Sequence, residues 1–187
     1  MMDGGHVRAC VRRASKTYDP DYIEKIAHLS IDSNEQVLRV LYYDCPPFQG
    51  SVKLPVSRTV KQFTSSDYWL KELAAKDLFA VRLGELKIRG FERKDQTSVV
   101  TNLTDDEFRP VFEQKGVDMR IGLDIASYST GRLADRIILM TGDADCIPAM
   151  KHARKAGLQV VLVEFPNARP VPGLKQHADY VRKVPWP

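Results

Sequence analysis

Two aspartates separated by one residue follow an apolar segment in the second half of the chain. The segment from Arg136 to Met140 reads RIILM and predicts a buried strand, and Asp143 and Asp145 come shortly after it. Carboxylates crowded at the end of a strand repel each other, and a hard divalent cation with oxygen ligands is the usual way to relieve that repulsion. The spacing therefore favours a metal-dependent enzyme over a binding module.

A second explanation exists for one of the two acids. Asp145 is well placed to cap a helix that begins near Cys146, because an aspartate side chain accepts hydrogen bonds from the free N–H groups of a first helical turn. The two acids, however, lie within the sequence TGDAD. Gly142 lets the backbone turn there, and the hydroxyl of Thr141 can hydrogen-bond a carboxylate or a loop amide. Together these features favour a metal site.

Two further acids are candidates for the same site. Asp3 belongs to it if residues 1–6 are the end of a first central strand. The alternative is a solvated terminus, because only Met1 and Met2 precede Asp3, which is short for a central strand. Asp118 lies in the first turn of a predicted helix, where the helix dipole alone also favours an acid.

Asp124 follows Asp118 by six residues on the same predicted helix. At about 100° per residue the two side chains point roughly 240° apart, so they cannot both face one site. Asp118 is the better candidate for a ligand. Asp124 is expected either to support the site from beside it or to face Arg120 or solvent.

The elements that must position these acids alternate between helices and strands. Hydrophobic periodicity and capping residues predict helices over residues 7–16, from Asp19 or Pro20 to Leu29, and over residues 67–76, 117–129 and 146–156. Short apolar runs predict strands over residues 37–43, 136–140 and 159–165. This order predicts an α/β fold with parallel strands, in which ligands bind beyond the carboxyl ends of the strands.

The remaining segments carry weaker patterns. Residues 54–66 are expected to be irregular, and residues 79–93 predict either a hairpin or a strand with an extension. The polar residues 94–104 predict a mobile loop. Thr104 followed by Glu107 predicts the cap of a short helix that runs into Gln114. Residues 174–184 predict a last short helix or strand.

Composition sets wide limits on function. The chain has 187 residues, of which 43% are hydrophobic, and this suffices for the core of one α/β domain. A net charge of +4 raises the expectation of a nucleic-acid partner only slightly. The widely spaced Cys10, Cys45 and Cys146 indicate neither a zinc site nor a disulfide framework. Without a signal-like start or a long apolar span, the chain is expected to be soluble and cytoplasmic, with no membrane partner.

The segments KGVDMRIGLD, TGDADC and KHARKAG resemble the NYN domain family, a PIN-like nuclease group that includes the LabA-like proteins. The resemblance is strong from Lys115 to Phe165, extends to residues 2–6, and is absent from about Tyr43 to Thr104. It implies one domain over residues 1–187, built on a Rossmann-like (PIN-like) parallel sheet with helices on both faces. Residues 45–114 would then be a variable β-hairpin or loop insertion, and residues 166–187 a C-terminal extension.

The same resemblance implies a metal-dependent ribonuclease, a hydrolase whose clustered aspartates bind Mg²⁺ or Mn²⁺ and cleave RNA phosphodiester bonds. Mapped residue by residue, the family's acids, both catalytic and metal-binding, fall on Asp3, Asp118, Asp143 and Asp145. His6 stands where the family usually has Asn, Thr141 replaces Ser, and Cys146 replaces Phe. We expect His6, Thr141 and Asp124 to support the acids, and Cys146 to be a small buried hydrophobe.

An acidic pocket repels a polyanion, so a ribonuclease needs cations at the rim of its site. Arg8, Arg12 and Lys16 recur at helical spacing after Asp3, and Lys151 and Arg154 follow Asp145. These five residues are the candidate contacts to the phosphates of a single-stranded or structured RNA. The alternative for either group is a solvated helix face.

Three functional hypotheses remain open on the sequence alone. The first is the metal-dependent ribonuclease, and the second is a catalytically inactive adaptor that keeps the fold and binds RNA. The third is a transferase that uses the Asp143-x-Asp145 pair to hold a metal–nucleotide diphosphate, which the additional acid Asp118 disfavours. The sequence leaves open whether the chain forms a homo-oligomer.

Overall fold

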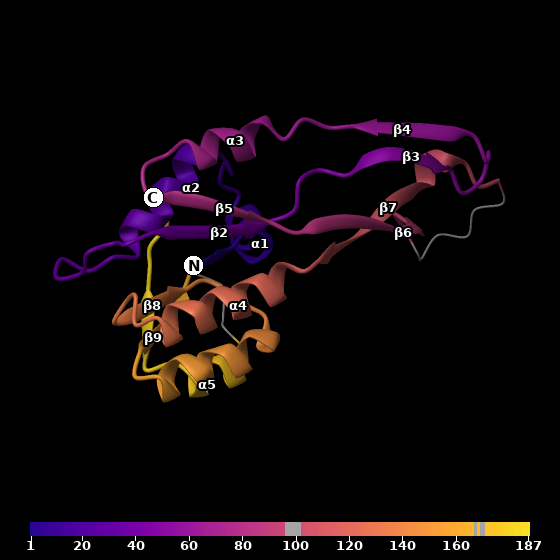
Figure 1. Ribbon diagram of the computed structural model, residues 1–187. Coiled ribbons are helices and arrows are strands. Elements are labelled where there is room, and N and C mark those ends of the chain that lie inside the picture. The colour runs from indigo at the N-terminus through magenta and orange to yellow at the C-terminus, as the bar shows by residue number, and fades with distance from the viewer. Residues whose placement is uncertain (96–101, 167, 169–170) are drawn as a thin grey trace.

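The computed structural model describes residues 1–95, 102–166, 168 and 171–187. Residues 96–101, the centre of the loop predicted over residues 94–104, lie outside the described part of the chain. The protein is an α/β molecule with a body and an arm that projects from it (Figure 1). The α/β prediction is therefore confirmed.

Two three-stranded sheets form the centre of the body, and all of their strand pairs are parallel, as predicted. The first has the order β1 (Met2–Asp3), β2 (Val40–Asp44), β5 (Phe79–Leu83), and the second the order β10 (Tyr180–Lys183), β9 (Gln159–Glu164), β8 (Arg136–Leu139). The sheets meet at a parallel bridge between Met2 and Met140. The carboxyl ends of β1 and β8 thus lie side by side.

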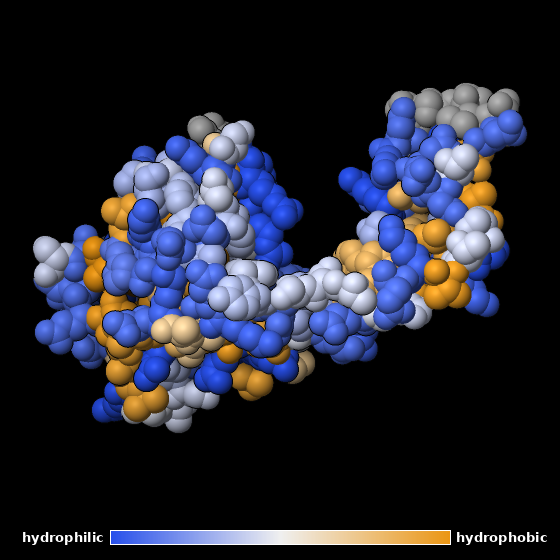
Figure 2. All heavy atoms as spheres, turned by 90° about the horizontal axis from the view of Figure 1, so that it is seen from above, coloured by the Kyte–Doolittle hydropathy of each residue, from blue (hydrophilic) through white to orange (hydrophobic). Residues whose placement is uncertain are grey.

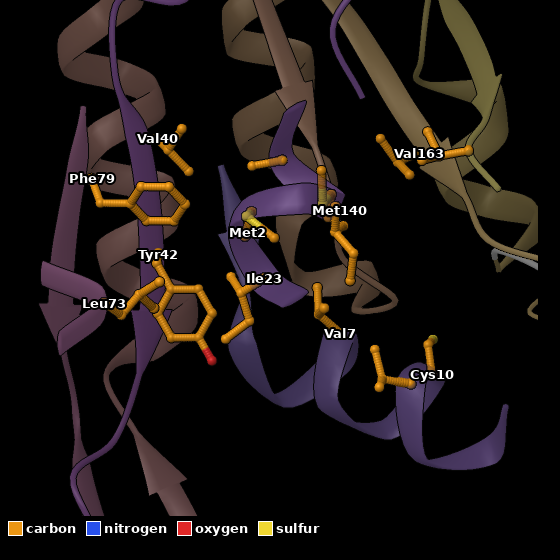
Figure 3. Packing of buried hydrophobic residues seen from close by; sticks show 14 of the residues in the cluster. Met2, Val7, Cys10, Ile23, Val40, Tyr42, Leu73, Phe79, Met140 and Val163 are labelled. Carbon is orange, nitrogen blue, oxygen red and sulfur yellow. The ribbon is translucent and has the colours of Figure 1, made fainter. Parts of the chain in front are cut away.

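Helices cover the two sheets from opposite sides. Their bounds are α1 Gly4–Arg13, α2 Pro20–Leu29, α3 Tyr68–Ala74, α4 Val117–Thr130, α5 Ile147–Lys155 and α6 Pro172–Gln176. Tyr42 lies in a buried cluster with side chains of α1, α2 and α3 (Figure 3), whereas its neighbour Tyr43 lies in a second cluster with α4 and α5. This division follows from β geometry, because successive side chains of a strand point to opposite faces.

The arm consists of two antiparallel hairpins. The longer pairs β6 (Glu85–Arg93) with β7 (Phe108–Lys115), and the shorter pairs β3 (Gln49–Lys53) with β4 (Val60–Thr64). Figure 2 shows that the arm stands away from the body and that a hollow separates them. The hairpins hold each other through aromatic contacts, since the ring centroids of Phe48 and Phe63 both lie within 6.2 Å of Phe112.

Two predictions for this middle region are wrong and one is confirmed. Of the two alternatives for residues 79–93, the strand with an extension is confirmed, because β5 pairs with β2 and β6 continues beyond Gly84 to pair with β7. Residues 54–66, however, are not wholly irregular, because β4 pairs with β3. The capping box of Thr104 and Glu107 is present, but its 3-10 helix Asp105–Glu107 ends after three residues, where β7 begins. Pairing with distant strands outweighed the local signals in these two cases.

The other expected elements are confirmed with shifted ends. The first helix begins at Gly4 rather than Val7, because Asp3 caps it, and it ends at Arg13. Asp19 caps α2 as its position suggested. The helix expected after Asp145 begins as a 3-10 turn, Ala144–Cys146, and continues as α5. The segment 174–184 contributes both a helix, α6, and a strand, β10.

Candidate functional site

Asp3 lies between the two sheets and is only 8% exposed. Its backbone N–H donates to the carbonyl of Met140 at 2.9 Å, which places the two-residue strand β1 beside β8. Its carboxylate accepts the N–H of His6 at 3.1 Å and so caps α1. Asp3 is therefore not part of a solvated terminus, which was the alternative.

The turn after β8 holds the acids of the TGDAD sequence. The buried hydroxyl of Thr141 donates to Asp3 at 3.3 Å and accepts the N–H of Asp143 at 3.1 Å. The expectation that Thr141 would bond a carboxylate is confirmed. The carboxylate of Asp143 accepts the N–H of Asp145 at 2.9 Å, so the capping residue is Asp143 rather than Asp145. Asp145 is exposed.

Asp118, in the first turn of α4, interacts electrostatically with the three other acids. Burial raises the pKa of its carboxyl, and the charges of Asp143, Asp3 and Asp145 raise it further. Burial also raises the pKa of Asp3, to which the charge of Asp44 contributes. Like charges raise the pKa of a carboxyl only across short distances. The four acids that the sequence selected therefore act on one another electrostatically.

These four carboxylates differ from most of the other acids in the protein by their lack of cationic partners. Within the described ranges, none of Asp3, Asp118, Asp143 and Asp145 forms an ion pair with a lysine, arginine or histidine. In the same part of the chain, no three metal-ligating side chains approach closely enough to hold one ion. The acids are thus neighbours with uncompensated charge rather than a closed ligand cage.

Sequence reasoning missed Asp44, which ends β2 and is fully buried. Its carboxylate forms an ion pair with Arg8 and accepts hydrogen bonds from Tyr42 at 2.9 Å and from Gln114 at 3.1 Å. A signal for it was present, because Asp44 follows the apolar run VLYY just as Asp143 follows RIILM. Unlike Asp3, Asp118, Asp143 and Asp145, Asp44 is neutralised by a cation.

This pairing accounts for the position of Arg8, a predicted RNA contact. Its guanidinium lies 5.5 Å from the ring centre of Tyr18 and 5.9 Å from that of Trp69, in addition to the ion pair with Asp44. The helix face of Arg8 is therefore not simply solvated. Whether Arg8 also contacts a substrate stays a prediction.

The other predicted cations lie on the surface. Arg12 is exposed on α1, Lys16 follows the end of that helix, and Lys151 is exposed on α5. Arg154 forms an ion pair with Asp179 at 2.8 Å. Their contacts to RNA stay predictions.

Asp124 lies apart from the four acids, as the helical phase required. It accepts a hydrogen bond from Tyr43 at 3.0 Å and forms an ion pair with Arg82 at 3.2 Å. The expected neighbour Arg120 instead donates to the carbonyl of Gly116. Asp124 thus joins α4 to β2 and β5, and its support of the site stays a prediction.

His6 and Cys146 border the acids. The His6 ring packs on Gly142, where an added Cβ would lie 2.6 Å from Nδ1, and burial lowers the pKa of His6. Cys146 is 2% exposed, and burial raises the pKa of its thiol to about 12, which keeps it neutral at physiological pH. The prediction that Cys146 is a small buried side chain is confirmed.

A cavity of about 620 Å³ lies at the other end of the strands. Its lining includes Val37, Arg136 and Gln159, which stand at or before the first residues of β2, β8 and β9. The four acids lie instead beyond the carboxyl ends, where α/β sheets bind ligands. In the described part of the chain, no helix is both long and apolar enough to cross a membrane.

The comparison with family models supports the resemblance noted in the sequence. A crystal structure of a protein of unknown function from Vibrio parahaemolyticus is similar, with a TM-score of 0.49 and 15% identity, over 95% of this chain and 85% of that one. No curated protein matches. The family model of the NYN domain matches residues 49–184, more than half of the chain. The protein belongs to the NYN domain family.

Proposed function

We propose that this protein is a divalent-metal-dependent ribonuclease whose centre is formed by Asp3, Asp118, Asp143 and Asp145. One observation carries the proposal: the hydroxyl of Thr141 joins Asp3 to the acidic turn at Asp143, and none of the four acids has a cationic partner among the described residues. Membership of the NYN domain family, which has a PIN-like nuclease type of fold, supports the same conclusion. Under this proposal the two parallel sheets act as one Rossmann-like sheet.

The donor set fits Mg²⁺ or Mn²⁺, because carboxylate oxygens are the hard ligands that both ions prefer. Asp3, Asp118, Asp143 and Asp145 would hold the ion after some of their carboxylates move toward it, because no three described ligand side chains are close enough to hold one ion as they stand. The positive charge of the ion would offset their mutual repulsion. When bound, such an ion polarises a phosphoryl oxygen and lowers the pKa of a water molecule.

Neighbouring groups orient Asp3 and Asp143 before any ligand arrives. Thr141 bonds both Asp3 and the backbone of Asp143, and the N–H of His6 holds a second oxygen of Asp3. Asp143 is oriented further by the N–H of Asp145. This preorganisation reduces the reorganisation that a charged substrate would otherwise demand.

The proposal is tested by RNA cleavage. Wild type and Asp143→Asn are compared on single-stranded and structured RNA with Mn²⁺, Mg²⁺ or EDTA. Asparagine is also a good helix cap, so this variant should keep the turn after β8. Asp135→Asn serves as the matched control, because Asp135 is exposed and precedes β8 at its opposite end.

Metal-dependent cleavage by wild type and the control, but not by Asp143→Asn, supports the ribonuclease. RNA binding without cleavage under any metal would favour the inactive adaptor. Metal-dependent binding of a nucleotide diphosphate without RNA cleavage would favour the transferase.

A further inference from the structure

The β3–β4 hairpin of the arm carries positive charge without any acid. From Phe48 to Ser66 the sequence contains Lys53, Arg58 and Lys61 but neither aspartate nor glutamate. All three cations are exposed. The other exposed residues of the two strands and their turn are uncharged: Gln49, Ser51, Gln62 and Thr64 are polar, and Val56 and Val60 are apolar.

The neighbouring β6–β7 hairpin also carries cations, but its acids neutralise them. Arg89 and Lys115 both pair with Glu113, Arg109 pairs with Glu92 at 2.7 Å, and Lys87 pairs with Glu85 at 3.4 Å. In contrast, Lys53 and Arg58 form no ion pair with any described residue, and the Lys61 ammonium lies 5.6 Å from the ring centre of Phe63. The unneutralised charge of the arm is therefore concentrated on β3–β4.

Two sets of interactions hold this hairpin in place. At its base, Phe48 and Phe63 pack against Phe112 of β7. At its turn, the carboxylate of Asp105 accepts the N–H groups of Val56 at 2.9 Å and of Ser57 at 3.3 Å. The cations are thus displayed on a supported element rather than on a free loop. Because the aromatic rings are engaged with each other, contact with a ligand would rely on charge more than on stacking.

The arm leaves the body beside the four acids. β3 begins shortly after Asp44, and β7 ends at Lys115, just before Asp118 in the first turn of α4. Gln114 at the base of β7 also donates to Asp44. An eight-residue strand such as β7 extends roughly 26 Å at about 3.3 Å per residue. A polymer whose scissile phosphate lies at the acids therefore has room to run across the hollow to the arm (Figure 2).

We infer that the β3–β4 hairpin binds the phosphate backbone of the RNA substrate through Lys53, Arg58 and Lys61. The inference rests on the proposed function, because it takes the polyanion to be RNA held at the four acids. The hairpin binds phosphates, so its affinity is independent of base sequence and weakens with salt. Its charge offsets the repulsion that the acidic centre exerts on the same strand.

The test is RNA binding by fluorescence anisotropy in EDTA, where cleavage is absent, from 50 to 300 mM KCl. The probe is a 20-nucleotide single-stranded RNA with a 5′ fluorescein. The variant Lys53→Ala/Arg58→Ala/Lys61→Ala is compared with wild type. A control with the same loss of charge replaces three exposed cations of the body, Lys25, Arg39 and Lys183, by alanine.

The plot of log affinity against log salt should become shallower by about 2 in the hairpin variant, because each phosphate neutralised on a single strand accounts for about 0.7 of the slope. At 0.1 M salt this corresponds to affinity lower by on the order of 10–100-fold. The control variant should bind like wild type. Equal slopes for the two variants would overturn the inference. Arg58→Ala alone, with an expected slope change of about 0.7, applies the same test if the triple variant does not fold.

The outcome for the hairpin is separate from the outcome for catalysis. If wild type does not cleave RNA but the hairpin variant loses RNA binding, the ribonuclease proposal fails and the assignment of the binding surface stands. If cleavage is intact and equally efficient in the hairpin variant and the control, the ribonuclease stands and the hairpin inference fails. The inference would also be overturned if the hairpin variant lost binding to phosphatidylserine vesicles but bound RNA as tightly as wild type.

Discussion

Thr141 Oγ1 lies 3.3 Å from Asp3 Oδ2 and 3.1 Å from the backbone nitrogen of Asp143. One buried hydroxyl thus connects an acid of β1 with an acid of the turn after β8, 138 positions away along the chain. The hydroxyl orients the carboxylate of Asp3 and the backbone of Asp143 without being a candidate ligand itself.

Replacing Thr141 by valine removes this hydroxyl and keeps the shape of the side chain. Groups that orient the ligands of a metal typically contribute about 10–100-fold to affinity or activity, so we expect a loss of that size in metal-dependent RNA cleavage. Thr141→Ser keeps the hydroxyl and should retain most of the activity. The initial rates of RNA cleavage by the two variants and wild type are measured across a Mn²⁺ titration. Equal rates for the valine and serine variants would contradict the role of the hydroxyl.

Divalent metal should stabilise the wild-type protein, because it offsets the repulsion among the four carboxylates. At a concentration of 100 times Kd the gain is about 2.7 kcal/mol, or roughly 5–10 °C in Tm for a chain of this length. Asp118→Asn should lose most of this shift, and Asp135→Asn should keep it. Differential scanning fluorimetry with Mn²⁺ and with EDTA measures the effect. A full shift in Asp118→Asn would exclude Asp118 as a ligand.

Asp44→Asn should destabilise the fold, because it leaves the guanidinium of Arg8 without its buried partner. Removing one member of a buried ion pair costs about 3–5 kcal/mol. Arg8 is partly exposed, so we expect the lower end of that range. Urea unfolding followed by circular dichroism gives the free energy. The double variant Arg8→Gln/Asp44→Asn should recover part of the lost stability. If Asp44→Asn were as stable as wild type, Asp44 would not be the buried partner that Arg8 needs.

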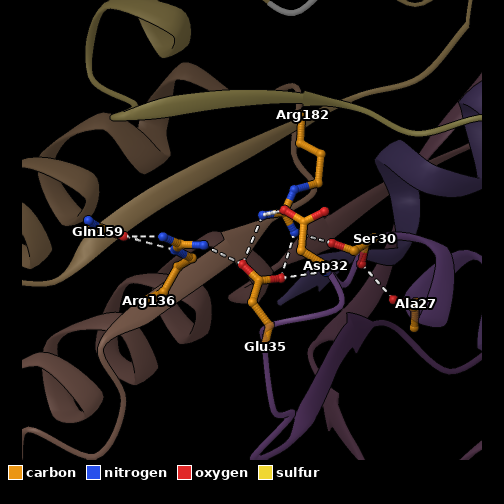
Figure 4. Close-up of polar contacts among 7 residues, drawn as sticks. All are labelled: Ala27, Ser30, Asp32, Glu35, Arg136, Gln159 and Arg182. Carbon is orange, nitrogen blue, oxygen red and sulfur yellow. Dashed lines mark hydrogen bonds and ion pairs between the residues drawn. The ribbon is translucent and has the colours of Figure 1, made fainter.

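Glu35 provides a test of pH dependence away from the acids. The two terminal guanidinium nitrogens of Arg182 each donate to the Glu35 carboxylate at 2.8 Å, and Arg136 also donates to it (Figure 4). The hydrogen bond from Arg182, with smaller contributions from Asp32 N–H and Arg136, lowers the pKa of Glu35 from 4.5 to about 2.

Because its pKa is lower in the folded state, Glu35 stabilises the fold above about pH 4.5, and this contribution is lost as the pH falls towards 2. Glu35→Gln should therefore reduce the free energy of unfolding at pH 7 by about 1.5–3 kcal/mol, the range for hydrogen bonds to charged groups, and by less at pH 3. Urea midpoints at the two pH values measure the difference. A deficit that is the same at both would contradict this account.

Local patterns in the sequence indicated the elements that carry the acids. RIILM followed by TGDAD predicted a strand and an acidic turn, and Asp118 was expected in the first turn of its helix, as observed. Such features depend on neighbouring residues, since hydrophobic periodicity and caps act within a few positions. They were sufficient to select four acids and to recognise the family.

The arm was beyond the reach of the same reasoning. β6 and β7 are joined by pairing between residues as far apart as Glu85 and Lys115, and a local capping box pointed to a helix where β7 begins. Strand pairing depends on partners distant in sequence, so local propensity does not specify it.

By itself, the sequence determined the α/β class, the acids at strand and helix ends, and membership of the NYN domain family. Only the tertiary structure decided that Asp3, which follows two residues, is buried beside β8, and that Asp44 is neutralised by Arg8. It also separated the paired cations of β6–β7 from the unpaired cations of β3–β4. The physical reason is that burial and charge compensation depend on which distant segments meet in space, and spacing along the chain does not encode those meetings directly.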